Sequence, residues 1–228
     1  MNARALGIDL AGVDAVVLSH GHYDHTGGVM PFAGINSSAR IYLRDCADGD
    51  FYHVEANDAH YIGIDKAILD LRQLELVHKR MTIDEEIDLF TNITGRRFYS
   101  SSNNALKIRL GDRFVCDPFH HEMCAVIHQD GKNYLFSGCA HNGVLNILDR
   151  YRVLYGGLPD IVLTGFHFKK DSAYTEEEKD NILGAAAELA ALPIVYYSGH
   201  CTGDAAFELM KGVMGDKLIR LHSGMQVM

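Results

Sequence analysis

Four side chains that can bind a metal ion lie within six residues near the start of the chain, in the stretch HGHYDH: His20, His22, Asp24 and His25. An apolar run, Ala15 to Leu18, precedes them. A strand followed by a glycine-containing turn can aim the first two histidines at one ion, while Asp24 and His25 reach a second position beside it. Imidazole nitrogens with a carboxylate suit zinc first, with iron and manganese as alternatives. The spacing therefore predicts a site for two divalent transition metals, because neither helix capping nor packing requires three histidines here.

Further metal-capable side chains follow the ends of later apolar segments. A hairpin is predicted over residues 124–128 and 134–137, and two more strands over 161–164 and 193–198. Next to these segments lie His120, His121, Cys139, His141, His167 and His200. The ligands of open α/β sheets gather at strand ends, so we expect these side chains near the first cluster. Any histidine not needed as a ligand could donate a proton to a leaving group or hold an oxyanion.

The elements that must position these residues alternate between strands and helices. Strands at 13–19 and 40–43, with a short helix between them, predict a βαβ unit and a partly parallel sheet. Helices are expected over 4–14, 65–74, 144–155, from a capping box at Thr175 to about residue 191, and over 205–214, before a last strand at 217–221. Residues 47–104 fit this alternation poorly, and we expect an insertion over the site within a single domain of residues 1–228.

Composition excludes several classes of function. A chain of 228 residues with 47% hydrophobic content can bury one sizeable core. The net charge of -9, a pI near 5.7 and the absence of a Lys/Arg run argue against nucleic-acid binding. With no long apolar run and no signal sequence, we expect a cytoplasmic protein without membrane association. Five scattered cysteines are typical of reduced thiols rather than disulfides.

The sequence resembles a known family at these motifs. HGHYDH matches the HxHxDH signature of the metallo-β-lactamase superfamily, and the later histidines follow in that family's order. Within it, the chain resembles the branch typified by the dihydropterin-methyl-ribofuranosyl-aminobenzene-phosphate synthases of methanopterin biosynthesis. The shared motifs are SHGHYDHTGG at 19–28, HHE at 120–122, GCAHNG at 138–143, GFHF at 165–168 and GHCTG at 199–203. The resemblance implies an α/β fold, the αββα sandwich, and likens His121 and His200 to the third and last metal histidines.

Two departures from the family pattern affect these expectations. Cys139 stands where the family usually has a bridging aspartate. Cys139, His141 or a water molecule would then complete the shell of the second metal. Cys139 is either a thiolate ligand, or an inert buried thiol with His141 as the ligand. Relatives also carry an N-terminal strand pair with a supporting aspartate, and this chain begins after that point, so we expect a sandwich lacking those strands. A second copy of the chain could cover the exposed sheet edge, giving a homo-oligomer.

These observations lead to one main functional hypothesis and two rivals. Two metals a few ångströms apart can ionise a bridging water near neutral pH, and the water then attacks phosphorus or a carbonyl carbon. The chain is predicted to be a metal-dependent hydrolase or phosphate-ester transferase on a phosphate-containing small molecule, with a synthase-like reaction on a pterin diphosphate as its specific form. The alternative is a non-catalytic metal-binding sensor or scaffold. A di-iron oxidoreductase is disfavoured because those relatives carry Glu where this chain has His22.

The residues of the site divide into two predicted roles. The catalytic candidates, which would orient the nucleophile or transfer protons, are Asp24, His141 and His167. The candidate metal ligands are His20, His22, Asp24, His25, His121, Cys139, His141 and His200. We expect the remaining histidines to be surface or packing residues: His53, His60, His78, His128 and His222. Of these, His53 and His60 lie in the expected insertion with several aromatic residues, and they could line a pocket there, although we favour packing.

Overall fold

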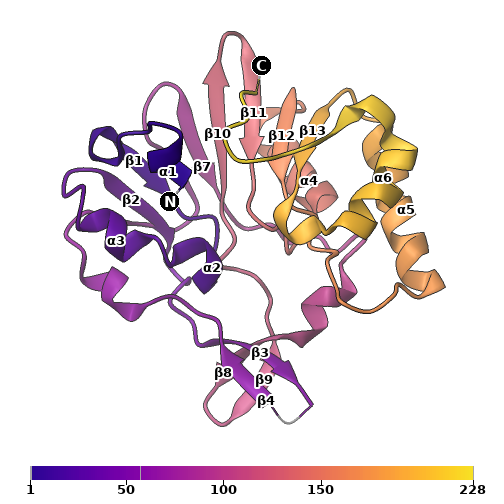
Figure 1. The fold of residues 1–228 in the computed structure, drawn as a ribbon, viewed down its shortest axis with the longest axis horizontal. Helices are drawn as coiled ribbons and strands as arrows, with labels where there is room; N and C mark the ends of the chain where they lie inside the picture. The colour runs from indigo at the N-terminus through magenta and orange to yellow at the C-terminus, as the bar shows by residue number, and fades with distance from the viewer. Residues whose placement is uncertain (1, 57, 228) are drawn as a thin grey trace.

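The computed structural model describes residues 2–56 and 58–227. One sheet consists of three parallel strands in the order β1 (Ala15–Val17), β2 (Arg40–Arg44) and β5 (Leu74–Val77). A second, mixed sheet has the order β14 (Leu218–Arg220), β13 (Val195–Ser198), β12 (Ile161–Thr164), β11 (Lys132–Phe136), β10 (Cys124–Gln129), β7 (Ile87–Phe90) and β6 (Arg80–Thr82). A small antiparallel sheet has the order β4 (Asp58–Tyr61), β3 (Phe51–Glu55), β8 (Leu106–Leu110) and β9 (Arg113–Cys116), and lies at the lower edge in Figure 1.

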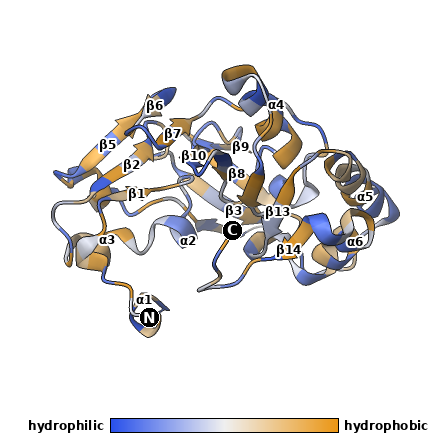
Figure 2. Ribbon diagram, turned by 90° about the horizontal axis from the view of Figure 1, so that it is seen from above, coloured by the Kyte–Doolittle hydropathy of each residue, from blue (hydrophilic) through white to orange (hydrophobic). Residues whose placement is uncertain are grey.

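Helices cover the outer faces of the two larger sheets (Figures 1 and 2). On the side of the three-stranded sheet lies α3 (Val29–Ala33), which follows α2 (Tyr23–Thr26). On the far side of the mixed sheet lie α4 (Val144–Tyr155), α5 (Glu176–Ala190) and α6 (Asp204–Met214). The short helix α1 (Asn2–Ala5) and five 3-10 helices complete the described elements: Leu10–Gly12, Lys66–Asp70, Ser101–Ala105, His200–Thr202 and Gly215–Lys217.

Alternation along the strands produces the layers. In β2, Ile41 and Leu43 point into the core shared with α3, whereas Tyr42 points the other way, into a cluster between the two sheets. In β10, Val126 packs into the largest core, beneath α4, α5 and α6, and Ala125 faces the first sheet. The order of layers is therefore helix, sheet, sheet, helix, as the αββα sandwich requires.

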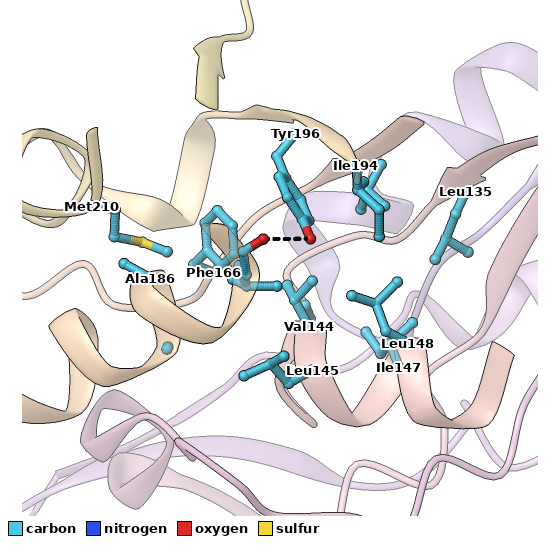
Figure 3. Packing of buried hydrophobic residues seen from close by; sticks show 14 of the residues in the cluster. Leu135, Val144, Leu145, Ile147, Leu148, Phe166, Ala186, Ile194, Tyr196 and Met210 are labelled. Atoms are coloured by element: carbon cyan, nitrogen blue, oxygen red, sulfur yellow. Dashed lines mark hydrogen bonds between the residues drawn. The ribbon is translucent and has the colours of Figure 1, made fainter. Parts of the chain in front are cut away.

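The largest core lies between the mixed sheet and its helices. Figure 3 shows Leu135 of β11 beside Val144 and Leu148 of α4, all less than 5% exposed. The buried hydroxyl of Tyr196 donates a hydrogen bond of 3.3 Å to the carbonyl of Leu189 at the end of α5. Burying these apolar side chains fixes α4 and α5 on the sheet, and thereby the loops that enter and leave β11, β12 and β13.

Several predicted elements are confirmed and others are not. The βαβ unit, the hairpin of β10 and β11, the α4 helix and the capping box at Thr175 all occur. The helix expected over 65–74 is instead the 3-10 helix Lys66–Asp70 followed by β5, and residues 4–14 form only α1 and a 3-10 turn. In the range 47–104, β3 and β4 belong to the small sheet, whereas β5 and β7 are strands of the two larger sheets.

No helix within residues 2–56 or 58–227 is long and apolar enough to cross a membrane.

Candidate metal centre

The HGHYDH loop leaves β1 and runs into α2 at the edge of the first sheet. His20 and His22 are buried, His25 is half-buried and Asp24 is exposed. Gly21 makes this path possible, because a Cβ atom there would lie 2.4 Å from the carbonyl oxygen of Ala47. The two buried histidines therefore point inward from a loop that is pressed against neighbouring backbone.

A first group of possible ligand atoms comes from His20, His22 and His141, and these atoms all lie within 4.8 Å of one another. The Nε2 atoms of His141 and His20 are 3.4 Å apart. Nδ1 of His141 is 3.0 Å from Oδ1 of Asn103. Because Nδ1 has this partner, Nε2 is the ring nitrogen of His141 that faces the group. Burial lowers the pKa of His20 and of His141 well below the ordinary value, and that of His22 to about 4. All three rings are therefore neutral at pH 7, the form that binds a metal.

A second group is formed by Asp24, His25 and His200, again with ligand atoms within 4.8 Å of one another. Oδ2 of Asp24 is 3.4 Å from Nε2 of both histidines, and the two Nε2 atoms are 3.2 Å apart. His200 follows β13, while the other two residues follow β1. The group thus joins the two larger sheets.

Cys139 lies between these two groups. Its Sγ atom is 3.2 Å from Nε2 of His25, and it also forms a group with His20 and His25. The hydrogen bond with Cys201 and burial both raise the pKa of Cys139, so the thiol is neutral in the metal-free chain. The sequence left Cys139 and His141 as alternative ligands, and the structure places both of them at the centre.

His121, which the sequence also predicts as a ligand, differs from His141 in its hydrogen-bond partners. Its Nδ1 atom accepts a hydrogen bond of 3.0 Å from the backbone N–H of Gly21, and its Nε2 atom is 3.0 Å from Oδ2 of Asp117. Both ring nitrogens therefore have protein partners, whereas His141 presents a nitrogen to His20. His121 also forms a third group with His22 and Asp117.

Three supporting residues were not identified from the sequence. Burial opposes ionisation of Asp117, but the hydrogen bond with His121 and the proximity of His22 lower its pKa overall, so it is a carboxylate. Buried Glu122 accepts hydrogen bonds from the backbone N–H groups of His141 (2.5 Å) and Asn142 (3.1 Å). Asn103 holds His141 from the other side. Glu122 belongs to the HHE motif and Asp117 to the DPF tripeptide just before it, so these motifs could have indicated both residues. No sequence pattern identifies Asn103, which lies in the 3-10 helix Ser101–Ala105.

Of the two remaining candidates, His167 faces the centre and His120 does not. The His167 ring lies 4.0 Å from that of His141, centroid to centroid, and its carbonyl accepts a hydrogen bond of 2.5 Å from Ser100. His120 is exposed, and its carbonyl accepts a hydrogen bond from Arg44. Of these two histidines, only His167 is therefore placed to transfer protons at the centre.

Backbone strain is concentrated at this centre. Four non-glycine residues that border it have left-handed backbone torsions with φ near 50°: Phe119, Ala140, His167 and His200. Such a conformation is unfavourable by roughly 1 kcal/mol or more for a residue with a Cβ atom. It turns each strand end sharply, so that the side chains converge on one place.

The donors present fit a divalent transition metal. Within the described residues, the buried Nε2 atom of His22 has no hydrogen-bond partner, because Oδ2 of Asp117 is 3.9 Å away. An unpaired buried nitrogen is unfavourable unless something else binds it. The close contact between the Nε2 atoms of His20 and His141 is also a poor hydrogen bond, because both rings are neutral and each has further neighbours. Imidazoles, a carboxylate and a thiol form the mixed set that zinc and iron favour.

A cavity of about 390 Å³ opens over the centre. Its inner wall includes His22, His141 and His167, and its outer wall includes His53 and His60 from β3 and β4. The volume suits a small organic molecule rather than a polymer.

Comparisons with known proteins identify the family and agree with the fold. Residues 2–96 match the family model described as the metallo-beta-lactamase superfamily. The chain is 28% identical to a metal-dependent hydrolase of the beta-lactamase superfamily of known crystal structure, with a TM-score of 0.77, covering 98% of this chain and 81% of that one. The isothiocyanate hydrolase from Delia radicum gut bacteria, 16% identical with a TM-score of 0.57 over 96% of this chain and 78% of that one, shares the fold.

Two curated proteins of Methanocaldococcus jannaschii are also similar. An uncharacterised protein is 31% identical over 163 residues, which are 68% of this chain and 58% of that protein, so the chain spans less than two thirds of its length. The second is 23% identical over 244 aligned positions, 98% of this chain and 78% of that protein. It is named 7,8-dihydropterin-6-methyl-4-(beta-D-ribofuranosyl)-aminobenzene-5'-phosphate synthase.

Proposed function

Because the chain belongs to the metallo-β-lactamase superfamily, we propose that it is a metal-dependent hydrolase of a small, phosphate-containing molecule. The observation that supports this most directly is the set of buried, neutral imidazoles of His20, His22 and His141, whose ligand atoms lie within 4.8 Å of one another beneath the cavity, with the Nε2 atoms of His20 and His141 3.4 Å apart. Neutral imidazoles that face one another in this way are typical of a site built around cations.

The residues divide into two sets of ligands in this proposal. One ion would be held by His20, His22 and His141, and the other by Asp24, His25 and His200, with Cys139 between them. Zinc is the first choice, with iron and manganese as alternatives. When bound, such ions supply Lewis-acid chemistry that activates water and stabilises developing negative charge. In this proposal His121 has a positioning role: it hydrogen-bonds the backbone of Gly21 and the carboxylate of Asp117, both of which lie next to His22.

Two side chains would carry out the proton transfers. Asp24 is exposed to the cavity, and its carboxylate can accept a hydrogen bond from the attacking water and so orient it. His167 lines the same cavity, and its buried Nδ1 atom has no hydrogen-bond partner in the part of the chain that the structure describes. We assign His167 the role of proton donor to the leaving group, because His141 is already held between Asn103 and His20.

A more specific form of the proposal is phosphate-ester transfer. In it, a nucleophile displaces diphosphate from a pterin derivative, and the leaving diphosphate takes the place that the leaving alcohol has in hydrolysis. The relative named as a dihydropterin-aminobenzene-phosphate synthase supports this form through its 98% coverage of the chain. The same residues would serve both reactions, since each develops negative charge at phosphorus oxygens.

The test is a screen of the metal-reconstituted chain against phosphomonoesters, phosphodiesters, lactones and pterin diphosphates. We expect elemental analysis to give about two metal ions per chain, and turnover of at least one phosphate ester that a chelator abolishes and metal restores. His167→Ala should lower kcat while the metal content is unchanged. Full metal occupancy without turnover of any class would favour the alternative, a metal-binding sensor or scaffold.

A further inference from the structure

Two histidines outside the metal centre line the cavity above it. His53 lies on β3 and His60 on β4, and the antiparallel register places them directly opposite each other. Their side chains are 39% and 70% exposed, and both border the 390 Å³ cavity. Residues paired across two strands share one face of the sheet, so the two imidazoles present a joint surface to the cavity.

The hairpin that carries them is hydrogen-bonded to the HGHYDH loop, residues 20–25, which we call the metal loop. The backbone N–H of Tyr23 donates a hydrogen bond of 2.8 Å to the carbonyl of Ile62, directly after β4. Phe51, two residues before His53 and therefore on the same face, packs its ring 4.1 Å from that of His121, centroid to centroid. The position of the two histidines relative to the centre is thus fixed by backbone and core contacts on both strands.

Each imidazole also has a carboxylate beside it. Nε2 of His60 is 2.9 Å from Oδ2 of Asp58, and Nε2 of His53 is 3.6 Å from Oε1 of Glu55. A carboxylate at Nε2 orients the ring and leaves Nδ1 as the ring nitrogen that faces away from it, free to contact a ligand. Among the described residues, no lysine or arginine lines this cavity. Apart from the histidines of the metal centre, His53 and His60 are therefore the residues there that can become cationic.

We propose that His53 and His60 form a subsite for an anionic group of the substrate, a phosphate or a carboxylate, away from the bond that reacts. This rests on the proposed function and names the substrate class more closely, as a molecule with a second negative charge. Two imidazole rings that can donate N–H groups from one sheet face suit the oxygens of such a group, since hydrogen bonds to an ionised acceptor are the stronger ones.

Kinetics with matched probes test the subsite. Three 4-nitrophenyl phosphodiesters, whose second alcohol ends in a methyl, a carboxylate or a phosphate group, are given to the metal-loaded chain. We expect KM for one anionic probe to be about tenfold lower than KM for the methyl probe. In His53→Ala and in His60→Ala this difference in KM should disappear, while kcat changes less than about threefold. His60→Arg should retain it. The probe with the lower KM distinguishes carboxylate from phosphate.

His78→Ala is the matched control, because His78 is 76% exposed and paired with Asp45 but lies outside the cavity. It should leave all three KM values unchanged. Equal KM values for the three probes in the unaltered chain, or an anionic advantage that survives both alanine variants, would overturn the subsite while the hydrolase remains.

Failure of the hydrolase itself is recognised by the absence of turnover of all probes. The subsite is then tested by binding, with ¹⁵N-labelled histidine in the metal-loaded chain. Methyl phosphate or acetate should shift the ring signals of His53 and His60, assigned from the two alanine variants, and leave that of His78 in place. Unshifted His53 and His60 signals with both anions would refute the subsite.

Discussion

At the scale of single residues, Cys139 and His141 both lie at the centre, so each can contribute to it in its own way. His141 has a partner for Nδ1 and a neighbouring imidazole at Nε2, as a metal-ligating histidine does. Sγ of Cys139 lies 3.2 Å from Nε2 of His25 and also forms a group with His20, so the thiol adjoins a histidine of each set of donors. Its raised pKa means that it must release a proton to bind a cation.

Alkylation should reveal whether Cys139 binds metal. We expect Cys139 to resist iodoacetamide while metal is bound and to react after chelation, with mass spectrometry of peptides as the measurement. Exposed Cys116 serves as the internal control and should react equally in both states. Cys139→Ser should lower metal affinity about tenfold. Equal labelling of Cys139 in both states, with unchanged metal content in the serine variant, would leave His141 as the ligand and Cys139 as packing.

At the scale of elements, the strands and helices with strong local signals were predicted well from the sequence. The apolar run before HGHYDH, the hairpin around Gly131 and the capping box at Thr175 each have a local physical cause, and all three occur. The helix predicted over 65–74 forms only as the 3-10 helix Lys66–Asp70, and the prediction was wrong at its C-terminal end, where β5 begins at Leu74 and pairs with the distant strand β2.

The same limit explains which parts of the site were missed. His53 and His60 have no distinctive spacing, and they face the cavity only because their hairpin folds back onto Tyr23. His121 and His141 could not be distinguished by motif, since their hydrogen-bond partners, Asp117 and Asn103, are set by the fold. The sequence predicted which residue types gather, but not which ring nitrogens remain available.

The metal loop itself supports a prediction about its backbone. Gly21→Ala should destabilise the chain by about 2 kcal/mol or more, because the new Cβ atom would meet the backbone oxygen of Ala47, which has little room to move. Metal affinity should fall as well, since His20 and His22 flank the glycine. Denaturant unfolding and metal titration are the measurements. Gly28→Ala is the control, as no heavy atom lies within 4 Å of the position that its methyl group would take, and it should stay near the parent in both.

At the scale of the whole molecule, the buried histidines make stability depend on pH. Burial lowers the pKa of His22 from its ordinary 6.5 to about 4, and those of His20 and His141 fall in the same direction. The unfolded chain therefore binds more protons than the folded chain in this window. The free energy of unfolding of the metal-free chain should be highest above pH 6.5 and decrease as the pH falls towards 4.

His22 alone should contribute roughly 3 kcal/mol to this loss, and urea unfolding at several pH values measures it. His22→Gln, which removes the titrating ring, should flatten the dependence. His78→Gln, at an exposed site, should not alter it. A metal-free chain equally stable at pH 4.5 and pH 7 would contradict this assignment.

The joining of two sheets at one centre also constrains how the protein is made. His25 and His200 are 175 residues apart in sequence, yet their ring nitrogens are 3.2 Å apart. On the ribosome, His20 to His25 emerge first, and His141 and His200 follow only after most of the chain has been synthesised. A nascent chain therefore exposes a partial set of donors for most of its synthesis. With the ligands proposed above, we expect tight metal capture only after the turn following β13 has been synthesised, and a chain that ends before that turn should bind metal more weakly.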